Sequence, residues 1–264
     1  MKKWKPRKGT IKLCILSTAL FTVIIWTIWG NTALMVNTVT VTAGRIPAAF
    51  SGFRIVQVSD LHNAEFGENN VRLLELLSES GPDIIVITGD LVDSGHTDID
   101  IAISFVEEAA RIAPVYYVTG NHEARLSQYD RLRNGLEAAG VSMLEDRAVE
   151  LERDGEKITL AGLSDPDFTV RGDIFGEIPA IVSTKLESLA DTESSYTILL
   201  SHRPELFESY ASSGIDLVLS GHAHGGQFRL PFIGGLVAPN QGLFPKYDAG
   251  VYMESSTQMV VSRG

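Results

Sequence analysis

A short apolar run followed at once by a polar loop recurs three times in the first half of this sequence. Phe53–Val58, Asp83–Thr88 and Val115–Val118 are each predicted to be a buried β-strand, because they consist largely of apolar residues. Asn70–Ser80 and Ile99–Ile112, between them, have apolar residues at helical spacing. Strands that alternate with helices predict an α/β fold with parallel strands, whose sites lie at the carboxyl ends of the strands.

The second half of the sequence repeats the pattern less clearly. Thr197–Leu200 and Ile215–Leu219 are two further predicted buried strands. Val36–Val41 is small, β-branched and polar, which suits a strand or an extended linker. The remaining segments are predicted to be a helix at Leu126–Ala139, a hairpin of 148–151 and 157–160 around Asp154-Gly155, a loop at 165–178 and a helix at 179–190.

Polar residues with metal-binding side chains follow these strands. Five of the six histidines lie there, whereas the sixth, His96, lies in a polar stretch with no strand before it. Taken singly, Asp60 or Asp90 is as readily a helix cap or a turn residue, and His202 a cap beside Pro204. Taken together, they are better explained by loops that converge at one edge of a sheet. The set is Asp60, His62, Asp90, Asn121, His122, His202, His222 and His224.

The chemistry of this set favours a metal centre. Carboxylate, imidazole and amide ligands without a thiolate suit Mn²⁺, Fe, Zn²⁺ or Co²⁺ better than the all-oxygen sites of Ca²⁺ or Mg²⁺. The set contains more ligands than one tetrahedral ion uses, so we expect two ions. Two ions about 3.5 to 4 Å apart, bridged by a carboxylate, are used for in-line displacement at phosphorus.

The N-terminal segment has the composition of a membrane anchor. A basic tail at 1–10 precedes an apolar span at 11–30, which is long enough to cross a bilayer as a helix. A cleaved signal peptide is the alternative, although Asn31–Met35 is a poor cleavage site. Because a basic flank stays cytoplasmic, we expect a single-pass protein with a cytoplasmic N-terminus and an extracytoplasmic domain. Residues 31–50 would then be an extended linker or first strand.

Charge and cysteine content restrict which partners and covalent links the protein can have. All 33 acidic residues follow the apolar span, whereas six of the 22 basic residues lie at or before Lys12, so the folded part is strongly acidic. Such a surface repels polyanions, and we therefore expect no nucleic-acid partner. The only cysteine, Cys14, lies in the apolar span, so the part after it has neither a disulfide nor a free thiol.

Five short blocks of the sequence resemble, in order and spacing, those of the calcineurin-like metallophosphoesterase superfamily. The membrane span, Ser201–Glu205 and Gly225–Gln227 are similar in particular to a membrane-associated bacterial branch of predicted phosphohydrolases. The resemblance implies a four-layer αββα sandwich of two mixed β-sheets flanked by helices, formed by residues 51–264. The blocks are Asp60-Leu61-His62, Gly89-Asp90, Gly120-Asn121-His122-Glu123, His202 and Gly221-His222-Ala223-His224.

The resemblance also implies a role for each residue of the set. His122 would not bind metal but would act near the leaving group, as a general acid or a charge stabiliser. The attacking group would be a hydroxide that bridges the two ions. One ion would be bound by Asp60, His62, Asp90 and His224, and the other by Asp90, Asn121, His202 and His222, with Asp90 bridging.

Two departures from the family pattern carry consequences. Purple acid phosphatases have a tyrosine three residues after the bridging aspartate, where this sequence has Asp93, so a tyrosinate-bound Fe(III) is disfavoured. Chains of the bacterial branch run on past a motif like Ser262–Gly264, where this sequence stops. We therefore expect a last strand to be missing.

The substrate is less well defined by the sequence. Arg125 and Arg203 lie close to proposed site residues and are candidates to hold phosphate oxygens, although an ordinary surface role is the alternative for each. Tyr247, in the segment Gln241–Tyr252, is a candidate contact in a further wall of the cleft, with a packed surface loop as the alternative.

These inferences predict a membrane-anchored, two-metal phosphohydrolase. Its substrate would be a phosphodiester or a pyrophosphate, since the anchor would hold the site near lipid-linked or envelope phosphates. The alternative is a binding module of the same fold that holds metal without catalysing a reaction. A metallo-β-lactamase-like site is excluded because that class needs His-x-His-x-Asp-His, whereas Gly225-Gly226 follows His222-Ala223-His224 here.

Overall fold

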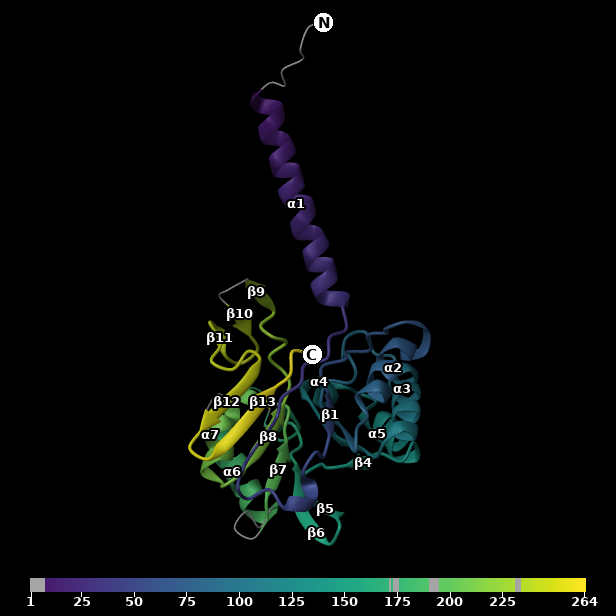
Figure 1. The fold of residues 1–264 in the computed structure, drawn as a ribbon, viewed down its shortest axis with the longest axis vertical. Helices are drawn as coiled ribbons and strands as arrows, with labels where there is room; N and C mark the ends of the chain where they lie inside the picture. Colours follow the sequence, from purple (N-terminus) through teal and green to yellow (C-terminus); the bar gives the residue numbers. More distant parts are fainter. Residues whose placement is uncertain (1–7, 171, 173–175, 190–194, 231–233) are drawn as a thin grey trace, which may run out of the picture. The chain divides into compact units, whose positions relative to one another are not determined.

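The computed structural model describes residues 8–170, 172, 176–189, 195–230 and 234–264 (Figure 1). It separates into two compact units, residues up to Val39 and residues from Thr40 to Gly264. Short 3-10 turns lie at Ala48–Phe50, Glu68–Asn70, Pro166–Phe168 and Pro204–Leu206. The helices are α1 (Lys8–Thr32), α2 (Val71–Ser80), α3 (Ile99–Ile112), α4 (Asn121–Arg125), α5 (Tyr129–Ala138), α6 (Ile178–Leu189) and α7 (Phe207–Ser212).

The strands of the second unit form three sheets among the described residues. A four-stranded sheet has the order β1-β2-β3-β4, a six-stranded sheet the order β12-β13-β8-β7-β6-β5, and a small sheet the order β11-β10-β9. The strands are β1 (Ile55–Val58), β2 (Ile84–Thr88), β3 (Val115–Val118), β4 (Ser142–Met143), β5 (Arg147–Arg153), β6 (Glu156–Gly162), β7 (Thr197–Leu200), β8 (Leu217–Ser220), β9 (Phe228–Leu230), β10 (Gly234–Ala238), β11 (Gly242–Leu243), β12 (Gly250–Glu254) and β13 (Thr257–Val261).

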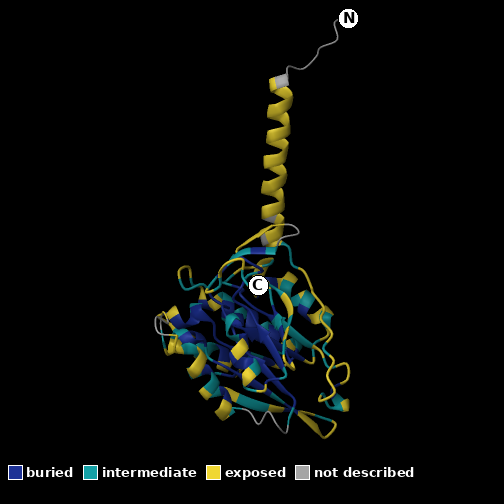
Figure 2. Cartoon of the chain, turned by 90° about the vertical axis from the view of Figure 1, so that its left-hand side faces the viewer, coloured by how far each residue is buried: buried dark blue, intermediate teal, exposed yellow. Residues whose placement is uncertain are grey.

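The first unit contains the predicted membrane span. Within α1, Gly9–Thr27 is long and apolar enough to cross a membrane, and none of it is buried by the rest of the chain. Figure 2 shows α1 exposed along its described length. A helix of about 20 mostly apolar residues with no buried side is unstable in water, which agrees with a membrane environment for this helix.

Alternating side chains of the central strands define the layers. In β2, Ile85 and Ile87 face a core shared with α2, α3 and α5, whereas Ile84 and Val86 face the core between the two large sheets. Successive residues of a strand point to opposite faces, and both faces of β2 are covered. Because both faces are covered, the sequence of β2 is a continuous apolar run rather than an alternating one.

The larger sheet is covered in the same way. In β7, Leu199 packs in a core with residues of α6 and α7, while Ile198 and Leu200 pack against the four-stranded sheet. Helices, sheet, sheet and helices therefore form four layers, and Figure 1 shows α2, α3 and α5 on the opposite side of the two sheets from α6 and α7. This arrangement confirms the predicted fold class.

One detail of the predicted sheets is wrong. The six-stranded sheet is mixed, as expected, but all three strand pairings of the four-stranded sheet are parallel. Each of its strands is joined to the next by a segment that contains a helix, which is the connection that parallel neighbours require.

Several element boundaries differ from those predicted. The helix expected at 126–139 is α5, which begins three residues later at Tyr129, and a separate short helix that was not predicted, α4, lies before it at Asn121–Arg125. The hairpin around Asp154 is longer than predicted, with Asp154 and Gly155 both at positive φ as a tight two-residue turn requires. Residues 40–50, the second half of the predicted linker or first strand, lie within the folded unit, where Phe50 is 5% exposed.

Candidate metal centre

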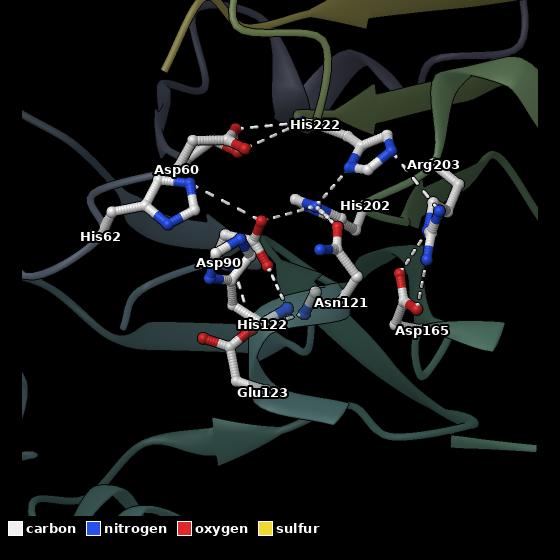
Figure 3. Close-up of polar contacts among 12 residues, drawn as sticks. Asp60, His62, Asp90, Asn121, His122, Glu123, Asp165, His202, Arg203 and His222 are labelled. Carbon is white, nitrogen blue, oxygen red and sulfur yellow. Dashed lines mark hydrogen bonds and ion pairs between the residues drawn. The ribbon is translucent and has the colours of Figure 1, made fainter. Parts of the chain in front are cut away.

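All eight polar residues predicted at strand ends lie along one edge of the two sheets. The four-stranded sheet contributes the loops after β1 and β2 and the start of α4, and the six-stranded sheet contributes the loops after β7 and β8. Figure 3, which labels all of these residues except His224, shows the labelled side chains converging from both sheets. The carboxyl ends of parallel strands meet here, as the sequence pattern predicts.

The first group of potential ligands is Asp60, His62, Asp90 and His224, whose ligand atoms lie within 4.8 Å of one another. His224 Nε2 is 3.5 Å from Asp60 Oδ1, and His62 Nε2 is 3.6 Å from Asp90 Oδ2. The rings of His62 and His224 are stacked with their centroids 5.1 Å apart. These separations exceed a good hydrogen bond, so the group is spaced for an atom that lies between its members.

The second group is Asp90, His202 and His222, joined by Asn121. His202 Nε2 lies 3.2 Å from Asp90 Oδ2 and 3.2 Å from Asn121 Oδ1, and His222 Nδ1 lies 3.0 Å from His202 Nε2. All four residues are buried: each is at most 5% exposed, and Asp90 is 1% exposed. Asp90 is common to both groups, through the same oxygen.

The backbone at these residues is strained. Asp60, His62, Asp90, His222 and His224 all have positive φ, between 48° and 67°, although none is glycine. Such conformations cost about 1 to 3 kcal/mol each and persist only where the surroundings enforce them. Their concentration in the two predicted ligand groups is typical of a functional site.

Glycine is required where two of the loops cross. A Cβ on Gly120 would overlap the carboxylate of Asp90, and a Cβ on Gly221 would overlap Ser59 and Asp60. The absence of a side chain at these positions lets the backbone of one loop approach the ligand carboxylate of another.

Glu123 holds the loop of Asp90, a role that the sequence did not reveal. Its carboxylate is 0% exposed and accepts hydrogen bonds from four backbone N–H groups. The donors are Asp90 N at 2.9 Å, Leu91 N at 2.8 Å, Val92 N at 3.3 Å and Gly120 N at 2.7 Å. Burial and the charge of Asp90 raise the pKa of Glu123 to about 7. A cation beside Asp90 would offset both effects.

His122 lies beside the first group and faces solvent. Its backbone N–H donates to Asp90 Oδ1 at 2.9 Å, and its Nδ1 accepts the backbone N–H of Ser94 at 3.0 Å. Since Nδ1 is the acceptor, the neutral ring carries its proton on Nε2. Its side chain is 24% exposed. The Nε2–H is therefore available to donate a hydrogen bond, and His122 belongs to neither of the two groups described above.

A cavity of about 330 Å³ opens over the centre. A larger hollow, of about 430 Å³, lies elsewhere, beside Phe53 and Arg153, and contains none of the predicted residues. We take the smaller cavity as the substrate cleft because the strained and buried polar residues line it. Its lining residues are Asp90, Asn121, His122, Arg125, His222, His224, Gln227, Pro239 and Asn240.

The protonation of the centre reflects its burial. Burial acts to raise the pKa of Asp90, but the neighbouring His202 more than reverses this and the pKa is lowered. Burial alone would lower the pKa of His202, whereas the adjacent Asp90 carboxylate raises it to about 10. Burial and the positive charges of His202 and Arg203 hold the pKa of His222 well below its usual range. The carboxylate of Asp90 thus attracts positive charge to the shared position.

The residues fit a pair of divalent metal ions. Both ring nitrogens of His62 are buried and have no hydrogen-bond partner among the described residues. A buried polar atom without a partner is destabilising unless something else binds it, and a metal ion is the natural partner of a neutral imidazole nitrogen. With the two carboxylates and Asn121, the donor set suits the first-row transition metals expected from the sequence.

The three predicted substrate contacts lie in different surroundings. Arg125 lines the cavity, with half of its side chain exposed, and pairs with Asp167 at 2.8 Å. Arg203 is 4% exposed and forms two hydrogen bonds with Asp165, at 2.5 and 2.8 Å, so its guanidinium is already paired. Tyr247 is not at the centre, because its ring packs in the core against Phe207 and Tyr252.

The sequence also did not predict a network of hydrogen bonds behind His222. Asn240 Nδ2 lies 3.1 Å from His222 Nε2 and 3.0 Å from Glu205 Oε1, while Arg203 connects His222 to Asp165. These partners keep His222 Nδ1 turned toward His202. Glu205 belongs to a block that we quoted, but no local signal pairs Asp165 or Asn240 with residues so distant in the sequence.

Comparison with known proteins supports the interpretation of this centre. The chain is 30% identical over 235 residues to an uncharacterised metallophosphoesterase, YkuE, of Bacillus subtilis, covering 85% of this chain and 76% of that protein. It is 28% identical over 224 residues to a "transmembrane protein with metallophosphoesterase domain" of Danio rerio, covering 82% of this chain and 49% of that one.

The fold also matches that of a solved protein. The structure of TT1561 of Thermus thermophilus superposes with a TM-score of 0.53 at 15% identity, covering 79% of this chain and 88% of that chain. Residues 53–226, which include every potential metal ligand, match the family described as calcineurin-like phosphoesterase. The chain therefore belongs to the calcineurin-like phosphoesterase family.

Proposed function

We propose that this protein is a membrane-anchored phosphohydrolase that uses two divalent metal ions to cleave a phosphodiester or pyrophosphate bond. The observation that carries the proposal is the position of Asp90. One oxygen of its carboxylate lies 3.6 Å from His62 and 3.2 Å from His202, between the two ligand groups. A carboxylate shared by two groups of metal ligands is what a dinuclear centre requires.

The ligand groups assign the residues to the two ions. Asp60, His62, Asp90 and His224 would hold one, and Asp90, Asn121, His202 and His222 the other. Divalent ions bound there supply Lewis acidity and lower the pKa of water. Mn²⁺, Fe, Zn²⁺ and Co²⁺ are all compatible with these ligands.

His122 and Arg125 would act on the substrate directly. The Nε2–H of His122 would donate a hydrogen bond to the leaving-group oxygen and stabilise its developing charge, since the backbone N–H of Ser94 occupies Nδ1. Arg125 would orient phosphate oxygens from the cavity wall. Its pairing with Asp167 is half-exposed, so a phosphate can compete for it at little cost.

We infer the substrate class from the proposed membrane anchor. An apolar helix, α1, and relatives named as transmembrane proteins support a membrane protein. The basic residues before α1 favour a cytoplasmic N-terminus and an extracytoplasmic catalytic unit. Phosphodiesters and pyrophosphates that are attached to lipid or to envelope polymers are then the phosphates within reach.

Turnover of a chromogenic phosphodiester by the detergent-solubilised full chain tests the proposal. We expect turnover with at least one of the four metals, and His122→Ala should lower kcat by about 10² to 10⁴ while metal content stays at two ions. His96→Ala is the matched control, since the side chain of His96 is 98% exposed and lies in neither ligand group.

Two outcomes would contradict the proposal. A folded, metal-loaded chain that turns over neither phosphodiesters nor pyrophosphates would support a binding module instead. Full turnover by the His122→Ala variant would leave the hydrolase but remove the role of His122 in stabilising the leaving group.

A further inference from the structure

The small sheet β9–β11 carries an apolar face that the fold does not use. Phe228, Leu230 and Leu243 are 70%, 42% and 73% exposed, and Phe244, next to β11, is 70% exposed. Large apolar side chains that are gathered and exposed on a soluble surface usually mark an interaction site. We therefore expect this apolar face to contact a partner.

Strand register shows that these side chains form one surface. Val237 in β10 pairs with Leu243 in β11 on one side and with Phe228 in β9 on the other. Paired residues on neighbouring strands share a face, and Leu230 shares it too because it is two residues from Phe228. We call Phe228, Leu230, Val237 and Leu243 the apolar face of the small sheet.

The opposite face of the sheet is occupied by the folded unit. Arg229, between Phe228 and Leu230, points the other way and bonds to the carbonyl of Gly225 at 2.7 Å and to Asp248 at 2.8 Å. The backbones of Gly226 and Gly235 are packed against each other, so a Cβ on either would overlap the other. The sheet is thus fixed to the folded unit by one face and free on the other.

The charge of the segment separates it from the rest of the folded unit. No Asp or Glu occurs from Leu217 to Tyr247, although all 33 acidic residues of the chain lie after Val39. The segment also contains two basic residues, Arg229 and Lys246, which are 40% and 63% exposed in their side chains. Because Arg229 and Lys246 are paired with Asp248 and Glu208, the segment carries little net charge, and an apolar face without acidic residues is compatible with the interface of an anionic bilayer.

Chain length brings a bilayer within reach. Only residues 33–39 separate the end of α1 from the folded unit, and they can extend at most about 25 Å. A unit tethered so closely meets the bilayer at a high effective concentration, so a modest apolar face suffices for docking.

We propose that the apolar face of the small sheet docks into the outer leaflet of the bilayer that α1 crosses. The proposal rests on the membrane anchoring proposed above and not on the reaction. Gln227, Pro239 and Asn240, which line the substrate cleft, belong to the same sheet and its adjoining turns. Docking would therefore hold the mouth of the cleft at the depth of lipid headgroups, where it meets phosphates of lipid-linked substrates.

Site-specific fluorescence in nanodiscs tests the proposal. Cys14 is the only cysteine, so a Cys14→Ala chain accepts one label at a chosen position. An environment-sensitive fluorophore would be attached at Leu243→Cys, on the apolar face, and at Glu152→Cys on β5 as the matched exposed control. The full chain would be placed, one copy per disc, in phosphatidylcholine with phosphatidylglycerol, with and without nitroxide-labelled lipid.

We expect the label at position 243 to be blue-shifted and quenched by the nitroxide, and the label at position 152 to report water. Adding Phe228→Ser to the Leu243→Cys chain should lower the ratio of docked to undocked protein by about tenfold, since one large apolar side chain is lost from the bilayer. Because Phe228 is exposed, this change should not affect folding.

The other outcomes overturn the proposal in different ways. If the chain enters the disc but both labels report water, the anchor is correct and docking is wrong. If the chain does not enter the disc, the anchoring itself fails. If the blue shift at position 243 appears only when discs carry two copies, the face joins a second copy of this chain rather than lipid.

Discussion

Replacement of Glu123 by glutamine tests how the centre is held together. In the native protein each carboxylate oxygen accepts N–H groups: Oε1 from Leu91 and Val92, and Oε2 from Asp90 and Gly120. Glutamine keeps one acceptor oxygen but puts an NH₂ group where the other oxygen was. Two buried N–H groups then face a donor and lose their acceptor.

The size of the effect follows from these two bonds. Each buried N–H left without an acceptor costs about 1 to 3 kcal/mol, so Glu123→Gln should lower the free energy of unfolding by roughly 2 to 6 kcal/mol. The matched control is Glu137→Gln on α5, whose side chain is 47% exposed and pairs with Arg133. Loss of that surface pair should change the free energy of unfolding by less than about 1 kcal/mol.

Urea unfolding of the detergent-solubilised chain, followed by circular dichroism, measures both variants. Fluorescence is unsuitable because the three tryptophans, Trp4, Trp26 and Trp29, all precede the folded unit. Metal counting gives a second readout: since Glu123 holds the loop of Asp90, the variant should lose both ions together. A Glu123→Gln protein that unfolds with the control and keeps two ions would refute the reasoning.

Two further predictions concern the ligand groups. His224→Ala should lose the ion held with Asp60 first, and His222→Ala the other ion, so that metal analysis of either purified variant gives one ion per chain; loss of both at once would contradict the assignment. Gly120→Ala should abolish metal binding because its Cβ would overlap the carboxylate of Asp90, whereas Gly44→Ala, with no atom within 4 Å of the added carbon, should bind metal normally.

The ligands could be predicted because their signal is local. An apolar run such as Ile84–Thr88 is recognised as a buried strand, and the residue at its end is read directly from the sequence. Parallel strands then bring Asp90 and His202 to the same edge without any knowledge of the loops between them.

The C-terminal strands could not be predicted in the same way. β9 to β12 are short, and most of their residues are partly or fully exposed, so they lack the apolar pattern that marks a buried strand. Their pairing depends on contacts such as Gly226 against Gly235, which no periodicity reveals.

Arg203 shows a different limit of prediction from the sequence. Its position next to His202 made it a candidate phosphate ligand, but its function is decided by Asp165, which lies 38 residues away and is 1% exposed. Only the three-dimensional fold shows that a carboxylate already occupies the guanidinium. Proximity in sequence to a ligand is therefore weak evidence for contact with substrate.

The ligands come from two sheets that are separate in the chain. Asp60, Asp90 and Asn121 belong to the four-stranded sheet, while His202 and His222 come from the six-stranded sheet, 81 residues beyond Asn121 at the nearest contact. Neither half contains a complete set, so the centre exists only once both halves have folded and docked. Binding of the ions then stabilises the docked arrangement over any state in which the sheets have parted. The bound ions would thus hold the two sheets together, and the supply of metal would govern the lifetime of the fold as well as its activity.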